Sequence, residues 1–240
     1  MTVAYDGTAY GGWQIQPNAP TVQAALEAAL KSLTGDDVKV HGSGRTDQGV
    51  HARGQVAHFD LTRDVETTGL RRGLNALLSH DIRVMRLTQA AADFHARRSA
   101  VGKEYRYFIW NGETVPPHLR LYRTHVRETL DLAAMRAAAG FLVGRHDFAA
   151  FTANPNRVVE STVRRLDRLD VRSRGREVCI VAAGEGFLYK MVRSLAGHLI
   201  RVGEGRLDAA VTTEILESRR RTARVQTAPP EGLFLWNVTY

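Results

Sequence analysis

The chain of 240 residues contains a single cysteine, Cys179, and only seven prolines. One cysteine excludes an internal disulfide and fits a reducing compartment. Long hydrophobic runs are also missing, since three basic residues and a histidine interrupt the most apolar stretch, residues 187–202. Such a segment does not cross a membrane. The sequence opens on a strand-like segment, Thr2–Tyr5, and not on a signal peptide, so we expect a cytoplasmic protein.

Acidic residues are too few to balance the basic ones. The chain has 33 Lys and Arg against 25 Asp and Glu, a net charge of +8, with a pI near 10.0. This excess, mostly arginine, indicates a polyanionic partner. A genome rich in G and C would also raise the arginine content, so charge alone leaves nucleic-acid binding open. The nine histidines lack the spacing of metal ligands, and we expect no metal and no other cofactor.

The most informative stretch is Gly44–Ala52, which reads GRTDQGVHA. It places Arg45 and Asp47 on a glycine-bracketed turn between two strand-like segments, 38–43 and 55–60. A carboxylate held at a strand end is a frequent place for chemistry, and the arginine would favour its ionised form. The simpler interpretation is a turn in which Asp47 bonds its own backbone and the glycines supply positive φ.

Other motifs fit this turn poorly. If the turn were a dinucleotide-binding fingerprint, Asp47 would repel the pyrophosphate. The turn is not a phosphate-binding loop of the Walker A type either, because no Gly-Lys-Ser/Thr follows it. A glycosidase would need a second carboxylate, and the sequence nominates none. An acid accompanied only by an arginine indicates a nucleophile or a base.

Hydrophobic periodicity predicts helices and strands in both parts of the chain. We expect helices between Thr21 and Gly35 and at 65–78, 130–142, 188–202 and 207–216. We expect strands at 2–5, 38–43, 55–60, 82–87, 103–110, 163–171, 178–183 and 233–240. A glycine and two prolines within 111–120 mark a break. This layout predicts an α+β fold with two similar α/β halves, 1–110 and 111–240.

Further segments carry motifs that occur together with this turn in one known family. They are Tyr5–Gly7 with Gly12–Gln16, Phe94–Arg97 with Lys103–Tyr107, Gly144–Phe151, Gly184–Arg193 and Pro229–Leu233. Together with Gly44–Ala52, they closely resemble the tRNA pseudouridine synthase A family over almost the whole chain. The departures are Gln48, where alanine is common, and Asn75–Leu78, where Asn-Leu-Pro is more usual.

The resemblance implies a mixed central β-sheet flanked by helices, with a catalytic cleft between the halves. It implies isomerisation of uridine to pseudouridine at positions 38, 39 and 40 in the anticodon stem-loop of tRNA, by a homodimer without a cofactor. Asp47 would be the catalytic residue and Arg45 would assist base flipping. Tyr105 would contact the target base, and Arg193 would pair with Asp47.

Considered without the family, these residues have simpler interpretations. Tyr105 lies in an aromatic and basic strand, which suits base stacking but also describes any half-buried strand. Arg193 lies off the apolar stripe of its helix, where a solvated side chain is usual, and His146 with Asp147 suggests a structural role. Two other functions stay open: a catalytically silent RNA-binding or chaperone protein, and a nucleoside hydrolase, which would want a metal or a second carboxylate.

Overall fold

The structure, a computed structural model, describes residues 1–153 and 160–240 and divides into two compact units. The first unit comprises Met1–Val101 with Phe234–Tyr240, and the second comprises Gly102–Leu233. The boundary predicted after residue 110 falls at the end of strand β5 (Gly102–Asn111), whereas the units divide before that strand. The chain's last strand belongs to the first unit because it pairs with a strand there.

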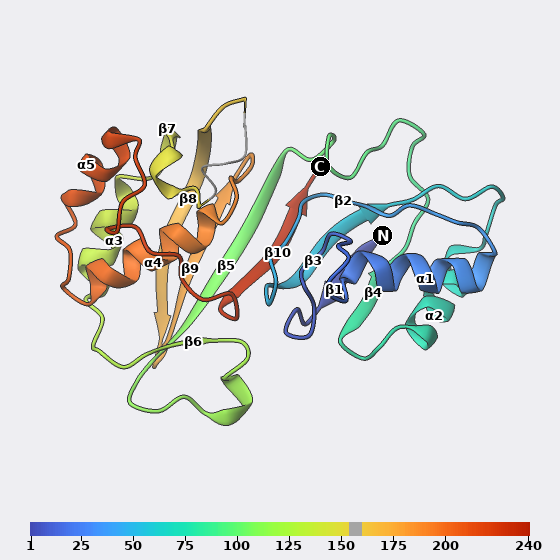
Figure 1. The fold of residues 1–240 in the computed structure, drawn as a ribbon, viewed down its shortest axis with the longest axis horizontal. Coiled ribbons are helices and arrows are strands. Elements are labelled where there is room, and N and C mark those ends of the chain that lie inside the picture. Colours follow the sequence, from blue (N-terminus) through green and yellow to red (C-terminus); the bar gives the residue numbers. More distant parts are fainter. Residues whose placement is uncertain (154–159) are drawn as a thin grey trace. The chain divides into compact units, whose positions relative to one another are not determined.

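The first unit is a mixed sheet with two helices (Figure 1). Its strands are β1 (Thr2–Tyr5), β2 (His41–Gly42), β3 (His51–His58), β4 (Ile82–Arg86) and β10 (Leu233–Thr239). Their order is β4-β1-β3-β10, with β2 pairing outside this order on β3; β10 runs parallel to β3 and the other pairs are antiparallel. Helices α1 (Val22–Thr34) and α2 (Thr67–Leu77) pack on each other, and α2 contacts β4.

The second unit has the same general construction, a sheet with helices packed on it. Its strands are β5, β6 (Thr124–Val126), β7 (Gly144–Asp147), β8 (Val163–Arg174) and β9 (Glu177–Gly184). They follow the order β5-β9-β8-β7, with β6 parallel to β5. Helix α3 (Leu132–Gly140) packs on β8, and helix α4 (Met191–Gly203) packs on β5. Helix α5 (Val211–Ser218) contacts β7. The unit also contains two short 3-10 helices, η1 (Pro117–Leu119) and η2 (Ala149–Phe151). The α+β class with a mixed sheet and flanking helices is confirmed.

Capping residues decide where the helices begin and end. Helix α1 starts where predicted, because Thr21 Oγ1 accepts from Ala24 N (3.3 Å), and it ends where Gly35 takes a left-handed φ of 80°. Helix α4 was expected from residue 188 but begins at Met191, since Lys190 has a φ of 55° that helical backbone does not allow.

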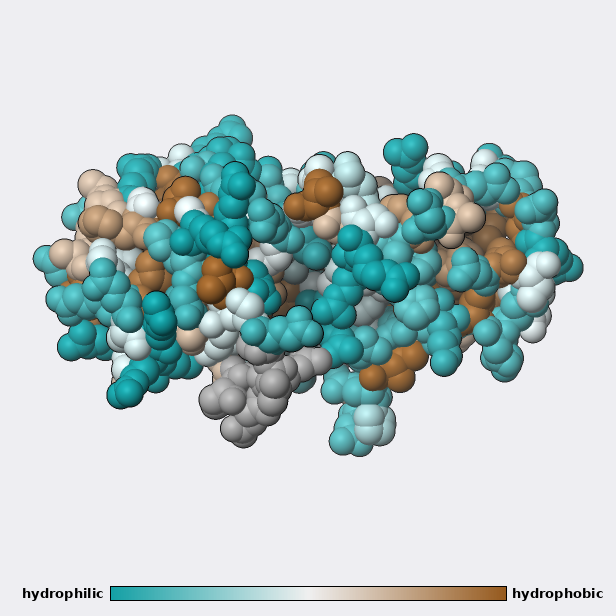
Figure 2. Space-filling view, turned by 90° about the horizontal axis from the view of Figure 1, so that it is seen from above, coloured by the Kyte–Doolittle hydropathy of each residue, from teal (hydrophilic) through white to brown (hydrophobic). Residues whose placement is uncertain are grey.

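Within the described ranges no helix is long and apolar enough to cross a membrane. Hydrophilic residues predominate on the face drawn in Figure 2.

A buried histidine in α4 predicts that the second unit loses stability in acid. His198 is fully buried, its Nε2 lies 2.9 Å from Thr212 Oγ1, and its ring meets Phe151 edge-on at 5.6 Å. Burial, and secondarily the charge of Arg201, lowers the pKa of His198 to about 4. The unfolded chain, with a histidine pKa near 6.5, therefore binds a proton more readily than the folded one.

Stability should accordingly be complete above pH 6.5 and fall as the pH drops through about 4. The difference between the two pKa values corresponds to roughly 3 kcal/mol of unfolding free energy. Urea unfolding of the wild type and of His198→Gln at several pH values checks this, because the variant should lose this part of the acid dependence. His118→Gln, at an exposed histidine, should keep it. Equal acid dependence in all three proteins would contradict the assignment.

Candidate active site

The GRTDQGVHA turn joins β2 to β3 in the first unit. The strands differ from those expected: β2 has only two residues, and β3 begins at His51, four residues earlier than predicted. Between them the backbone turns sharply, as Val50 N donates to Asp47 O (3.1 Å) and Gly49 takes a φ of +75°. Arg45 is exposed and Asp47 is half-buried, so both side chains lie at the surface of a tightly folded loop.

Buried polar groups hold the loop from beneath. The buried hydroxyl of Tyr5, on β1, lies 2.8 Å from Thr46 Oγ1. Thr46 is the residue between Arg45 and Asp47 in the sequence. The Gln55 amide, fully buried on β3, donates to Gly44 O (2.9 Å) and accepts from Ser43 Oγ (2.7 Å). Because satisfied buried polar groups rigidify their surroundings, the backbone on both sides of Asp47 is held in one conformation.

The segment after β1 holds the loop from the side. Trp13 N donates to Thr46 O (3.1 Å), and Gly49 N donates to Tyr10 O (3.3 Å). Gly12 makes this approach possible: it has a φ of +101°, and a Cβ atom there would lie 2.4 Å from Thr46 O. The Gly12–Gln16 motif therefore supports the Asp47 loop through its backbone.

Gly12→Ala should displace this loop. We expect a loss of roughly 2 kcal/mol of unfolding free energy from the steric overlap and the left-handed backbone, with a large loss of activity. Gly35→Ala is the matched control, because Gly35 also has a positive φ, +80°, but has nothing within 4 Å of the added methyl group. Thermal unfolding and turnover of both variants check this. If the two variants lost activity equally, backbone strain and not loop displacement would be the cause.

Arg45 is oriented by a residue of the neighbouring segment. Its Nε donates to Gln14 Oε1 (3.1 Å), and both side chains are exposed. The contact directs the guanidinium along the loop surface. The sequence alone did not single out Gln14 for this contact, although it lies in the Gly12–Gln16 motif.

A second carboxylate, which the sequence did not nominate, lies at the other end of the loop. Asp6 Oδ1 lies 3.1 Å from Nδ1 of the buried His51. The same Nδ1 accepts from Gly7 N (3.0 Å), and the His51 ring stacks on Phe234 at 4.6 Å. Asp6 Oδ1 also accepts from the backbone and hydroxyl of Thr8. These contacts give Asp6 a structural role in fixing the end of the loop. The Tyr5–Gly7 motif was its only signal in the sequence.

Tyr105 and Arg193 belong to the second unit. Tyr105 lies on β5 opposite Ala182, is 8% exposed, and meets the Phe187 ring edge-on at 5.0 Å. Tyr107 and Ile109 on the same face of the strand are also buried, but so is Phe108 on the opposite face, so burial does not alternate strictly along β5. Arg193 is half-buried near the start of α4.

Arg193 is also tied to a backbone segment of its own unit. Its Nε donates to Ala228 O (2.8 Å), and Ala228 N donates to the Arg193 carbonyl (3.0 Å). The guanidinium thus has a defined orientation before any substrate is considered.

The Gly144–Phe151 motif supports packing. Asp147 Oδ1 accepts from Ala149 N (3.0 Å) and Thr162 Oγ1 (2.6 Å), and His146 Nε2 lies 3.0 Å from Val143 O. These contacts favour the structural role expected for this segment. Across residues 1–153 and 160–240, no group of three His, Cys, Asp or Glu side chains is placed to bind a metal ion.

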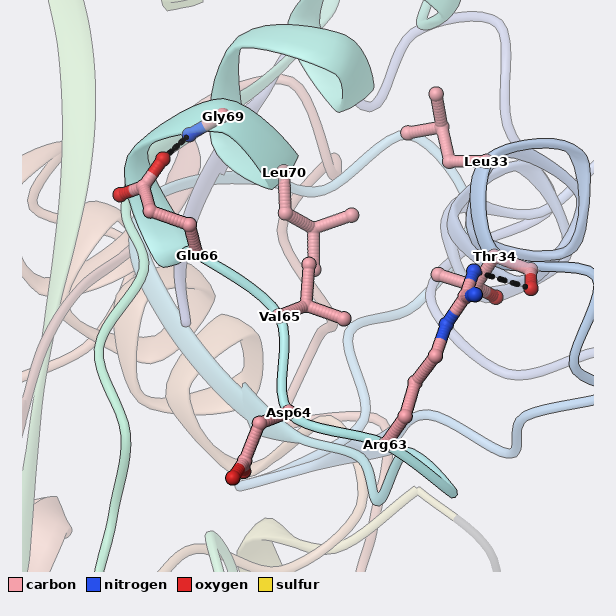
Figure 3. Close-up of a pocket in the computed structure, with 8 residues that line it drawn as sticks. All are labelled: Leu33, Thr34, Arg63, Asp64, Val65, Glu66, Gly69 and Leu70. Carbon is pink, nitrogen blue, oxygen red and sulfur yellow. Dashed lines mark hydrogen bonds between the residues drawn. The ribbon is translucent and has the colours of Figure 1, made fainter.

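A pocket elsewhere in the first unit is unrelated to these residues. It lies between the end of α1 and the start of α2 and is lined by Leu33, Val65 and Leu70 among others (Figure 3). Two of its charged side chains form hydrogen bonds with backbone groups at the helix ends. Arg63 donates to Thr34 O (3.1 Å) at the end of α1, and the Glu66 carboxylate accepts from Gly69 N at the start of α2. None of its lining residues is a predicted site residue.

Comparison with known proteins agrees with the motifs. A family model described as tRNA pseudouridine synthase matches residues 1–97 and 138–240. Proteins called tRNA pseudouridine synthase A are 44% identical in Brevibacillus brevis, over 99% of this chain and 97% of the relative, and 45% identical in Geotalea uraniireducens, over 100% and 98%. The relative in Chlamydia trachomatis is 43% identical over 100% of this chain and 91% of its own length. The chain therefore belongs to the tRNA pseudouridine synthase family.

Proposed function

We propose that this protein isomerises uridine to pseudouridine at positions 38, 39 and 40 in the anticodon stem-loop of tRNA. The observation that carries the proposal is the loop around Asp47, whose backbone is fixed by Tyr5, Gln55 and Gly12 in a member of this family. A rigid loop that presents one carboxylate and one guanidinium is suited to catalysis on a bound nucleotide. RNA binding alone would not need this construction.

The reaction is an isomerisation and requires no cofactor. The N1–C1′ glycosidic bond breaks, the uracil rotates, and a C5–C1′ bond forms; C5 loses a proton and N1 gains one. The nucleotide must first leave its helical stack, which costs roughly a few kcal/mol. A basic protein with an exposed Arg45 beside the loop offers a cation to hold the displaced nucleotide or its backbone.

We assign the site residues as follows. Asp47 is the catalytic residue and acts at the sugar, either as nucleophile on C1′ or as base for a sugar proton. Arg45 assists base flipping and is oriented by Gln14. Tyr105 contacts the target base through its ring and hydroxyl, and Arg193 pairs with Asp47. The family motifs that contain these four residues support the assignment.

We further propose that the protein acts as a cytoplasmic homodimer. One chain of 26.6 kDa is small relative to a tRNA, and a two-fold dimer would extend the basic surface beyond the anticodon arm. Light scattering at micromolar concentration tests this. A monomer with full activity on intact tRNA would rule the dimer out.

Tritium release tests the reaction itself. A tRNA transcript carrying [5-³H]uridine should lose tritium to water when the protein is added, because the C5–H bond breaks, and the RNA chain should remain intact. Release of uracil would instead indicate a nucleoside hydrolase. Tight tRNA binding without tritium release or uracil would indicate a silent RNA-binding protein.

A further inference from the structure

The segment that joins α5 to β10 in the second unit lies along one side of α4. Arg193, Gly197 and Arg201 are spaced four residues apart, so they follow that side of the helix. Their contacts in the segment are, in the same order, Ala228, Gln226 and residues 223–224. The segment therefore runs antiparallel to the helix and reaches Arg193 with its later residues.

Gly197 allows the segment to lie directly on the helix. A Cβ atom at Gly197 would be 2.3 Å from Gln226 O and 3.1 Å from Ala228 N. At this close range Ala228 N donates to the Arg193 carbonyl (3.0 Å), and Arg193 Nε donates to Ala228 O (2.8 Å). The position of the Ala228 carbonyl therefore sets the orientation of the Arg193 guanidinium.

Arg221 joins the two residues that adjoin this pair. Its Nη1 donates to Ser194 Oγ (2.9 Å), and its Nη2 donates to Thr227 Oγ1 (2.8 Å). Ser194 follows Arg193 on the helix and is fully buried. Thr227 precedes Ala228 in the segment. One guanidinium therefore bridges the helix and the segment at the place where Arg193 is held.

The bridge is a matter of geometry and not of charge pairing. Arg221 is half-buried, and in the part of the chain that the structure describes its partners are two hydroxyl groups and no carboxylate. A guanidinium carries its donors in a rigid fork, which suits two acceptors at fixed positions. Because polar groups that are buried and hydrogen-bonded rigidify their surroundings, the bridge keeps Ser194 and Thr227 at one separation.

We propose that Arg221 is a positioning residue for the isomerisation, which keeps the Arg193 guanidinium in the orientation that the reaction needs. This rests on the proposed function, in which Arg193 pairs with Asp47. Arg221 acts through its bridge and does not itself touch the substrate. Since a small misplacement of a catalytic group can cost a large factor in rate, loss of the bridge should lower turnover and not the affinity for tRNA beyond the effect of one lost charge.

Arg221→Met removes both donors and keeps much of the apolar stem, and turnover at saturating tRNA should fall roughly tenfold or more. Arg201→Met is the matched control. Arg201 ties the same segment to the same helix by donating to Ala223 O (2.8 Å) and Arg224 O (3.1 Å), about 12 Å further along the helix axis than Arg193. Both variants lose one charge and two hydrogen bonds, so their tRNA dissociation constants should change alike and their Tm values should fall by roughly 2 to 6 °C. Only Arg221→Met should lose turnover.

A double-mutant cycle separates positioning from general destabilisation. Arg193→Ala leaves no guanidinium to position, so adding Arg221→Met to it should lower the residual tritium release, measured with protein in excess, no further. Thermal unfolding shows whether Arg221→Met is folded. Thr227→Val takes its place in both comparisons if it is not, because valine keeps the shape of threonine and removes one hydroxyl of the bridge, and turnover should then fall several-fold.

Three results would each overturn the proposal. They are wild-type turnover in the folded bridge variant, an equal loss of turnover in Arg201→Met, and an undiminished further loss in the Arg193→Ala background. Failure of the proposed function would look different, since the wild-type protein would then release no tritium although it bound tRNA.

Discussion

Asp47→Asn should lower tritium release from tRNA by roughly 10⁴-fold or more, the scale seen when an enzyme loses its nucleophile or base. Asparagine is nearly the same size as aspartate but can neither attack C1′ nor accept a sugar proton. The loop should keep its shape, because the Asp47 backbone carbonyl still accepts from Val50 N (3.1 Å) and Thr46 still meets Tyr5. Single-turnover tritium release measures the chemical step directly.

Binding must be measured in the same experiment. The tRNA dissociation constant of Asp47→Asn should stay within a few-fold of the wild type, since the substitution removes no basic side chain that could bind a phosphate. Asp131→Asn is a suitable control, because Asp131 caps α3 through Ala133 N and Ala134 N and asparagine caps equally well. Turnover near the wild-type rate in Asp47→Asn would remove Asp47 from the catalytic role.

Tyr105→Phe should lower turnover by roughly 10²-fold or more while the free energy of unfolding changes by less than about 1 kcal/mol. Phenylalanine keeps the ring that packs on Phe187 and removes only the hydroxyl proposed to act at the base. Turnover at saturating tRNA and urea unfolding are measured on the same preparation.

Tyr107→Phe is the matched control, two residues along the same face of β5. The Tyr107 hydroxyl contacts Thr124 Oγ1 (2.5 Å) and Pro229 O (3.0 Å) inside the second unit, so its removal should cost about 1 kcal/mol of unfolding free energy and leave turnover unchanged. Equal effects of the two substitutions on turnover would demote Tyr105 to a packing residue.

Local signals in the sequence predicted most elements of the fold. Thr21 and Gly35 define both ends of α1. The early start of β3 and the late start of α4 were not predicted. Pairing with β1 and β10 extends β3 to His51, and the left-handed backbone of Lys190 delays α4. These causes lie in pairing and backbone geometry, and residue periodicity does not reveal them.

The contacts that support the Asp47 loop could not be predicted either, because they join residues far apart in the sequence. Tyr5 and Thr46 are separated by 41 positions, and the Asp6–His51 contact has no local pattern. The motifs identified Asp47, Arg45, Tyr105 and Arg193 as candidates, and their roles stay predictions. The contacts that make the loop rigid required coordinates.

Mapping pseudouridine in a tRNA transcript before and after incubation with the protein shows whether uridines 38, 39 and 40 are converted. Transcripts should carry uridine at 38, 39 and 40, with a matched transcript carrying cytidine at all three. We expect new pseudouridine at these positions in the first transcript, none in the second, and none in either with Asp47→Asn. Unmodified uridine at all three positions, or pseudouridine formed only elsewhere in the tRNA, would contradict it.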